Sequence, residues 1–413
     1  MLSVSDIKKI RNMKIFESKY FNPILMCLCF LFGIYSIIFY GDRVVDNEWG
    51  IMLHNLIYDG ILSIRTVDGV PVPNAFMPPL YPYFLYVVKK IFPTSDAYVF
   101  IIQFLQLNMY LFSIIILYRT LKIFYSKSIS NLGSAIFGLY PLYIYSLSQV
   151  SSITLQVLLI VIFLYYFIRL FKFYKFKYLI IFSICSGLLI LLRGEFFIFV
   201  IFSICFLLIK NRNLKILILS LFFIILTISP YLIRNLIIFD TIVITKSGGY
   251  NLLKGNNPQA KVEGKRMLGN EIRIAPEIEV DLKKLKASDK YDLYVDKIFL
   301  NQALKNIKKE PLRYIYLYFK KAISFILIDF ESSYPNYYSV LNILPKLLIS
   351  ISALISMFYL ASFRINLYNY FILYYFLNIG LFSFFFILPR YSLSLLPIQI
   401  ILSMYLFKKL KLL

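Results

Sequence analysis

Histidine, cysteine and acidic residues are scarce in this chain, and each scarcity argues against a class of site. The 413 residues include one histidine, four cysteines and 21 aspartates and glutamates. With His54 as the single histidine, a zinc site of the usual kind is not expected. The cysteines lie in apolar stretches without Cys-x-x-Cys spacing, which indicates small core residues, neither metal ligands nor a disulfide framework. They are Cys27, Cys29, Cys185 and Cys205.

The shortage of acids leaves a formal net charge of +23. The basic residues form short runs between apolar segments, and no soluble domain with a basic, aromatic-lined face is evident. We therefore expect no nucleic-acid binding. Anionic membrane surfaces and phosphate-bearing lipids match this charge better.

Apolar residues are abundant, because they make up 60% of the chain, with 40 Phe and 35 Tyr. This composition predicts an all-α polytopic membrane protein with about ten transmembrane helices. The expected spans are 23–41, 97–118, 129–148, 152–170, 178–192, 195–210, 214–234, 339–361, 366–388 and 391–407.

Two further apolar stretches, 80–92 and 313–330, contain the pairs Lys89-Lys90 and Lys320-Lys321. If neither stretch crosses the membrane, every short basic loop falls on the cytoplasmic side, as the positive-inside rule requires. We therefore expect both to lie flat on the periplasmic surface as amphipathic juxtamembrane helices. The first span is then an uncleaved anchor, and both termini are cytoplasmic.

This topology divides the chain into three parts. Residues 1–234 form an amino-terminal transmembrane module with a first periplasmic loop at 42–96, residues 235–338 a sizeable periplasmic loop region, and residues 339–413 the carboxyl-terminal transmembrane helices. Periodicity predicts a helix over 292–310 that ends at Glu310-Pro311. No strand-rich region is expected.

Charged residues from distant segments fall on the predicted periplasmic rim. Asp46 and Glu48 follow the first span, and outer helix ends carry Arg193, Arg234 and Arg390. Each has a plainer interpretation, since arginines at helix ends commonly anchor at the interface and an acid often only begins a solvated loop. The stretch 248–258 with Lys254 lacks the nucleotide P-loop pattern, and turn formation explains it equally well.

Taken together, the rim supplies what transfer of a sugar from a polyprenyl phosphate requires. A carboxylate at the water boundary accepts the proton of an acceptor hydroxyl, and direct displacement of the lipid phosphate inverts the anomeric carbon. Cationic side chains stabilise the charge that develops on the departing phosphate. We therefore expect Arg193, Arg234, Arg390 and Lys254 to bind the donor phosphate.

Five motifs in this order resemble a known family. They are Asp46-Asn47-Glu48-Trp49, Pro78-Pro79-Leu80-Tyr81-Pro82, Ser229-Pro230-Tyr231-Leu232-Ile233-Arg234-Asn235, Gly248-Gly249-Tyr250-Asn251-Leu252 with Gly255-Asn256-Asn257-Pro258, and Arg390-Tyr391-Ser392-Leu393-Ser394-Leu395-Leu396-Pro397. Over roughly residues 20–400 the chain resembles bacterial integral-membrane glycosyltransferases of the GT-C superfamily, the relatives of protein mannosyltransferases and lipid A aminoarabinose transferases.

The resemblance implies a polyprenyl-phosphate-sugar donor, a lipid, glycan or protein acceptor, and an inner-membrane enzyme of the cell envelope with a periplasmic active site. It also implies a catalytic first-loop acid, which is assigned to Asp46, with Glu48 as the second choice. Positions two apart on a helix face nearly opposite ways, so only one of the two acids is expected to face the substrate. The expected substrate-loop residues are Tyr81, Asn235, Gly249, Tyr250, Asn251, Asn256 and Asn257.

One motif departs from the family pattern. Many relatives carry an acid at the outer end of the fourth span that helps to bind a metal or a second substrate, where this chain has Ser151-Ser152-Ile153-Thr154. No metal ligand is therefore assigned and no cofactor is certain; a divalent metal stays open but is not favoured.

Two other classes of protein share parts of this outline. An O-antigen-type polysaccharide polymerase or ligase is also polytopic with one large outer loop, but we would expect its function to depend on outer-loop arginines and histidine without a first-loop acid. A transporter or flippase predicts inverted repeats and broken helices near mid-membrane, which the sequence does not show.

The predicted sidedness is directly testable. A reporter fused at position 270 should be periplasmic, and one fused at position 174 should be cytoplasmic, because only this orientation places the short basic loops inside. Alkaline phosphatase and fluorescent-protein fusions at both positions measure this. Activity of the phosphatase fused at 174 would reverse the topology.

Overall fold

A computed structural model describes residues 14–93, 95–263 and 276–410, and nearly all regular structure in these ranges is helical. The elements in chain order are η1 (Lys14–Glu17), α2 (Phe21–Tyr40), α3 (Glu48–Tyr58), β1 (Arg65–Val67), β2 (Val70–Val72), α4 (Leu80–Ile91), α5 (Ser95–Leu121), α6 (Lys127–Gly138), α7 (Pro141–Ser148), α8 (Ile153–Lys172), α9 (Phe176–Leu192), α10 (Phe196–Asn211), α11 (Leu214–Phe239), α12 (Gly248–Gly255), η2 (Pro276–Ile278), α14 (Glu279–Lys283), α15 (Tyr291–Lys309), α16 (Pro311–Ile326), α17 (Val340–Leu360), α18 (Leu367–Ser383), η3 (Pro389–Ser394) and α19 (Leu396–Lys409).

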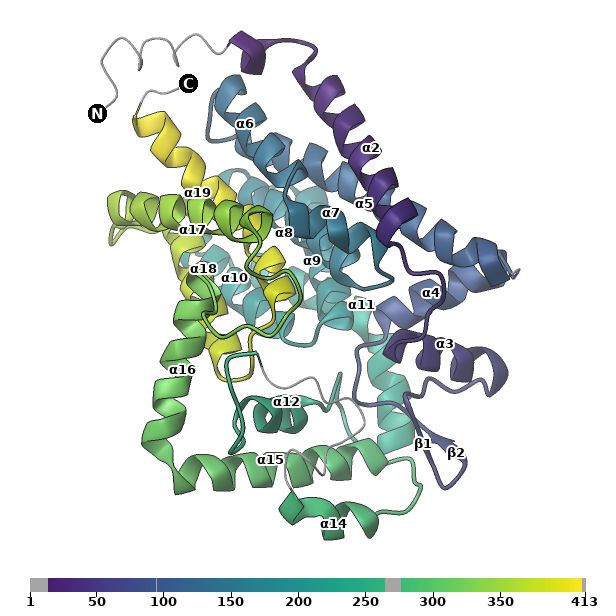
Figure 1. The fold of residues 1–413 in the computed structure, drawn as a ribbon. Coiled ribbons are helices and arrows are strands. Elements are labelled where there is room, and N and C mark those ends of the chain that lie inside the picture. The colour runs from purple at the N-terminus through teal and green to yellow at the C-terminus, as the bar shows by residue number, and fades with distance from the viewer. Residues whose placement is uncertain (1–13, 94, 264–275, 411–413) are drawn as a thin grey trace.

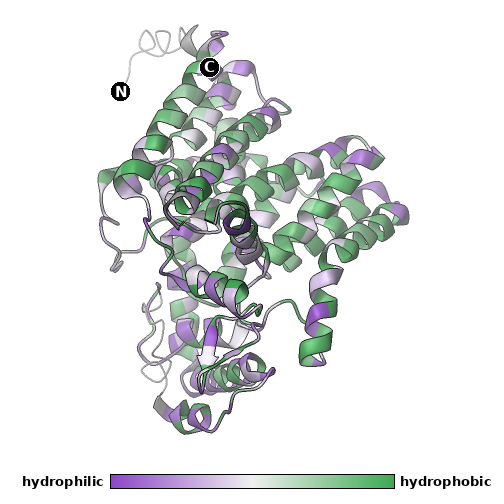
Figure 2. Ribbon diagram, turned by 90° about the vertical axis from the view of Figure 1, so that its right-hand side faces the viewer, coloured by the Kyte–Doolittle hydropathy of each residue, from purple (hydrophilic) through white to green (hydrophobic). Residues whose placement is uncertain are grey.

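Several of these helices are built to cross a membrane. Five have the length and apolar composition of a span, namely α2, Tyr98–Leu121 of α5, α8, α11 and α17. The shorter α9 and α10 are also apolar. Figure 2 shows hydrophobic residues dominating the helical bundle, with hydrophilic residues concentrated beyond it. The protein is therefore a multi-pass membrane protein, while the predicted total of about ten spans stays a prediction.

The predicted span 129–148 is not one continuous helix. It is divided into α6 and α7, and Tyr140 between them has an extended backbone (ψ 115°). The cause is Pro141, which disfavours a helical conformation in the residue before it and begins α7 at a position where its missing N–H costs nothing. The predicted span 391–407 likewise begins as the separate turn η3 before α19 starts.

The two ends of the bundle carry different parts of the chain. Figure 1 places the start of α2 and the end of α19 at one end, and α12, α14, α15 and the β1–β2 hairpin at the other. This arrangement agrees with the prediction that both termini lie on one side and the two large loops on the opposite side. Assignment of those sides to cytoplasm and periplasm stays a prediction.

The loop end has a small hydrophobic core of its own beneath the bundle. Helix α15 matches the helix predicted over 292–310, and α12 packs along it. The buried residues of this core are Tyr250, Leu253, Ile278, Val295, Phe299 and Ala303. The antiparallel β1–β2 hairpin beside it was not predicted; its two-residue turn has Asp68 and Gly69 at positive φ, as such hairpins require.

Helix α16 covers most of the stretch 313–330, and its expected orientation on the membrane surface stays a prediction. Helix α16 turns sharply away from α15 at Glu310-Pro311 and rises along α18 (Figure 1). Buried residues on one face, including Leu317, Lys321 and Phe325, explain this packing. The buried face of α16 therefore packs against neighbouring helices.

Candidate active site

The first-loop acids are held in place by the residue between them. Asn47 caps α3: its Oδ1 accepts a hydrogen bond from Trp49 N (3.0 Å), and its Nδ2 donates to the Val150 carbonyl (3.3 Å). Asp46 is exposed just before the helix, and Glu48 is the first helical residue and partly buried. The start of α3 is thus fixed against the turn between α7 and α8.

A third carboxylate, Asp42, lies beside this pair and was missed from the sequence. Its Oδ2 accepts a hydrogen bond from Val150 N (2.7 Å), and Gln103 Nε2 donates to its carbonyl oxygen (2.9 Å). Burial raises the pKa of Asp42, and the nearby charge of Asp46 raises it further. The available signal was its position, directly after the first span and only four residues before Asp46.

Lys254 approaches the same region from α12. Its ammonium lies 4.4 Å from the centre of the Phe386 ring, a cation–π distance. Burial and the nearby Arg390 lower the pKa of Lys254, whereas Glu48 opposes that shift. Glu48 and Arg390 are therefore both close enough to Lys254 to interact with its charge, although they come from opposite ends of the chain.

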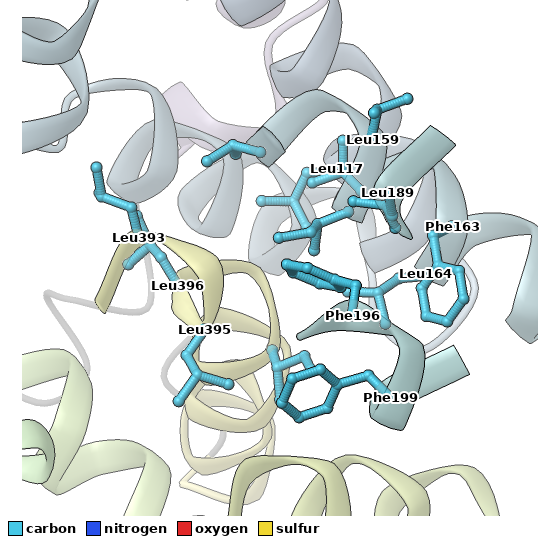
Figure 3. Close-up of a cluster of buried hydrophobic side chains, with 14 of the residues drawn as sticks. Leu117, Leu159, Phe163, Leu164, Leu189, Phe196, Phe199, Leu393, Leu395 and Leu396 are labelled. Carbon is cyan, nitrogen blue, oxygen red and sulfur yellow. The ribbon is translucent and has the colours of Figure 1, made fainter. Parts of the chain in front are cut away.

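Arg390 lies on η3, which is anchored by leucines that alternate with its polar residues. Figure 3 shows Leu393, Leu395 and Leu396 packed around a buried cluster that also contains Phe196 and Phe199 of α10. The same packing therefore fixes η3 and the turn just before α10. That turn carries the second arginine of the site.

This second arginine is Arg193, between α9 and α10. Its Nη1 lies 3.9 Å from Glu195 Oε1, a long ion pair, and its buried Nε has no hydrogen-bond partner. Burial raises the pKa of Tyr391, and the positive charges of Arg193 and Arg390 oppose this rise. Both guanidinium groups are thus within electrostatic range of one tyrosine, so the structure brings Glu48, Lys254, Arg390 and Arg193 into one neighbourhood.

Arg234 has a different environment. Its Nη1 donates to the Asn74 carbonyl (3.1 Å) and to Asn235 Oδ1 (2.7 Å), and its guanidinium stacks near the rings of Tyr231 and Phe239. These contacts tie the first outer loop to the end of α11. No described interaction connects Arg234 to Lys254 or Arg390, and its expected phosphate-binding role stays a prediction.

Most of the expected substrate-loop side chains also bond within the protein. Tyr81 donates to Gln106, Asn235 to Val243, and Asn251 to Ser247. In α12 and the segment after it, Asn256 donates to Leu252 and Phe384, and Asn257 donates to Leu253 and Lys254. Gly249 and Tyr250 are buried against α15. These residues shape the loop end instead of lining an open surface.

Two aspartates on α15 hold this end together, and sequence reasoning did not single them out as site residues. Asp292 Oδ2 accepts hydrogen bonds from Ala75 N (3.0 Å) and Phe76 N (3.2 Å) of the first loop. One helical turn later, Asp296 Oδ1 accepts from Gly249 N (2.7 Å) and Tyr250 N (3.2 Å) of α12. Burial raises the pKa of both aspartates, and the accepted hydrogen bonds oppose this shift.

The stretch that departs from the family pattern lies beside Asp42. Ser151 Oγ and Thr154 Oγ1 are buried without hydrogen-bond partners, and the preceding Val150 peptide is held by Asp42 and Asn47. Among the residues that the structure describes, no three histidine, cysteine, aspartate or glutamate side chains converge as metal ligands. No metal-binding role is therefore assigned.

Comparison with known families supports the resemblance seen in the sequence. Residues 77–233 match the family model described as dolichyl-phosphate-mannose-protein mannosyltransferase, which belongs to the GT-C glycosyltransferase superfamily. The match includes Tyr81 and Arg193 but ends before Arg234, and it does not reach Asp46 or Arg390. No curated protein matches the chain. This match over part of the chain agrees with the predicted GT-C resemblance and suggests a membrane glycosyltransferase of this type.

The fit of α12 against α15 can be tested with two adjacent glycines. A methyl group at Gly249 would overlap the Asp296 carbonyl oxygen, whereas one at Gly248 would meet open space. Gly249→Ala should therefore destabilise the protein by about 1–3 kcal/mol through overpacking, and Gly248→Ala should not. Thermal unfolding in detergent compares the two. Equal melting temperatures for both variants would show that α12 does not pack as described.

Proposed function

We propose that this GT-C glycosyltransferase transfers a sugar from a polyprenyl-phosphate donor to a lipid, glycan or protein acceptor at the periplasmic face of the inner membrane. The observation that carries the proposal is that Glu48 and Arg390 both lie within electrostatic range of Lys254. This places the first loop, α12 and η3 around one site. A carboxylate and several cations at the boundary of an apolar bundle are what the reaction needs. A cell-envelope glycan such as lipopolysaccharide is a suitable product class.

The donor phosphate binds to Lys254, Arg390 and Arg193. Three cations share this neighbourhood with Glu48 and Glu195. The unpartnered Nε of Arg193 is a buried donor that an anion would satisfy. Guanidinium groups bind phosphate through two parallel hydrogen bonds, and Lys254 adds a point charge.

Asp46 serves as the base. It is exposed at the start of α3 and faces no cation in any described ion pair, whereas Glu48 interacts with Lys254. The acceptor oxygen attacks the anomeric carbon and forms the new glycosidic bond, its proton passes to the Asp46 carboxylate, and the bond from the anomeric carbon to the phosphate oxygen breaks. The polyprenyl phosphate leaves with that electron pair, so the configuration inverts.

Neutralising the two first-loop acids separately tests their roles. Asp46→Asn should lower kcat by about 10²–10⁴-fold, because a general base is lost while donor contacts remain. Glu48→Gln should change the donor KM more than kcat, because it alters the charge around Lys254. The assay follows transfer of a radiolabelled sugar from its polyprenyl phosphate by purified protein.

Asp68→Asn is the matched control, since Asp68 lies at the tip of the β1–β2 hairpin with a positive φ that asparagine also adopts. It should leave transfer unchanged. Full activity of both Asp46→Asn and Glu48→Gln would refute a first-loop base.

The phosphate-binding role of Lys254 predicts a pH dependence. Its pKa lies below the ordinary lysine value of 10.5, so its ammonium loses its proton at a lower pH than an exposed lysine would. Donor affinity should therefore fall as pH rises through this lowered pKa, because the neutral amine binds phosphate less well. Lys254→Arg should bind donor without this decline, since arginine stays protonated. Donor KM measured between about neutral pH and pH 10 tests both; the same decline in wild type and Lys254→Arg would assign it to another group.

A further inference from the structure

We propose that Asp296 and Lys321 are positioning residues that hold α12 at its two ends and so place Lys254 against the donor phosphate. The inference rests on the phosphate-binding role proposed for Lys254. It assigns a function to two buried, oppositely charged side chains that the transfer reaction itself does not use.

The amino end of α12 is held by Asp296. One carboxylate oxygen accepts hydrogen bonds from two free N–H groups in the first turn of the helix, those of Gly249 and Tyr250. These groups have no partner inside the helix, so an external acceptor is required when they are buried. A negative charge at this end also matches the positive end of the helix dipole.

The carboxyl end is held by Lys321 of α16. Its side chain is fully buried (0% exposed), and its Nζ donates to the Gly255 carbonyl at 2.8 Å. No ion pair involves Lys321 within the described ranges. Burial of an ammonium is costly and lowers the pKa of Lys321 to about 7, while the partial negative charge at the carboxyl end of α12 favours the protonated form.

Close packing at both ends restricts the position of α12. A methyl group on Gly249 would overlap the Asp296 carbonyl oxygen, and one on Gly255 would overlap that of Phe385. The backbones of α15 and of the segment before η3 therefore approach both ends of the helix directly. Arg390 follows that segment, so the same contacts relate α12 to the second phosphate-binding cation.

These contacts at the two ends of α12 determine the position of Lys254. An isolated helix of eight residues is unstable in water, so the two charged residues and the packing determine where α12 lies. Lys254 directly precedes Gly255, whose carbonyl Lys321 holds, and its ammonium reaches the Phe386 ring. Loss of either charged residue should therefore move the Lys254 ammonium while leaving Asp46 in place.

A double-mutant cycle tests this inference. The variants are Asp296→Asn, Lys321→Met and Lys254→Met, with each of the first two also combined with Lys254→Met. Lys320→Met is the matched control, since Lys320 is the neighbouring residue but pairs with Glu331 at the surface. Two quantities are measured in detergent: the donor KM, and the equilibrium affinity for radiolabelled polyprenyl phosphate, which needs no turnover.

We expect Asp296→Asn and Lys321→Met each to weaken phosphate-lipid binding by roughly tenfold, as groups that orient a ligand-binding side chain commonly do. Neither should weaken binding further once Lys254 is already methionine, because both act through it. Lys320→Met should match the wild type. If Lys321→Met does not give monodisperse protein, Lys321→Gln, which still donates a hydrogen bond, replaces it in the cycle.

The possible failures are distinguishable. If Lys254→Met leaves phosphate-lipid binding unchanged, the proposed phosphate site itself is wrong. If Lys254→Met weakens binding but the other two variants add their full effects to it, they act independently of Lys254 and the positioning inference is wrong. The same holds if they lower only the melting temperature and leave binding unchanged.

Discussion

Two aspartates one turn apart on α15 join segments that are far apart in the chain. Asp292 binds main-chain N–H groups of the first outer loop, and Asp296 binds those of α12. The aromatic contact between Phe76 and Tyr250, with ring centres 5.1 Å apart, joins the two bound segments directly. Because the carboxylates are buried, their hydrogen bonds have no water to compete with them, and the geometry of the loop end depends on both.

The membrane explains why the charges gather where they do. Charge inside hydrocarbon is costly, so polar chemistry is confined to the ends of an apolar bundle. Leucines of η3 and phenylalanines of α10 provide a rigid base there, and they place Arg390 and Arg193 near one tyrosine. The first loop and α12 then bring Glu48 and Lys254 from the other side. Apolar packing thus supports a site made of charged side chains.

Much of the helical framework could be predicted, because spans and amphipathic helices leave periodic signals. The ranges of α2, α8, α9 and α15 agree closely with their predictions. The break before Pro141 was missed although its signal was present, since a proline restricts the residue before it. Arg234 shows a different limit. An arginine at a helix end suits a phosphate ligand and a structural tie equally well, and only the structure shows that Arg234 donates to the Asn74 carbonyl.

By itself, the sequence determined a multi-pass helical membrane protein that resembles GT-C glycosyltransferases, with acids after the first span and arginines at helix ends. Hydropathy, charge and motifs are properties of short segments, so they can be read without knowing what each segment contacts. Tertiary structure alone decided which of those charged residues meet, that Asp42 and the α15 aspartates belong with them, and that α16 rises beside α18. Those outcomes depend on packing between residues that lie far apart in the chain, from 47 positions for Gly249 and Asp296 to 217 for Ala75 and Asp292, for which the linear chain carries no local signal.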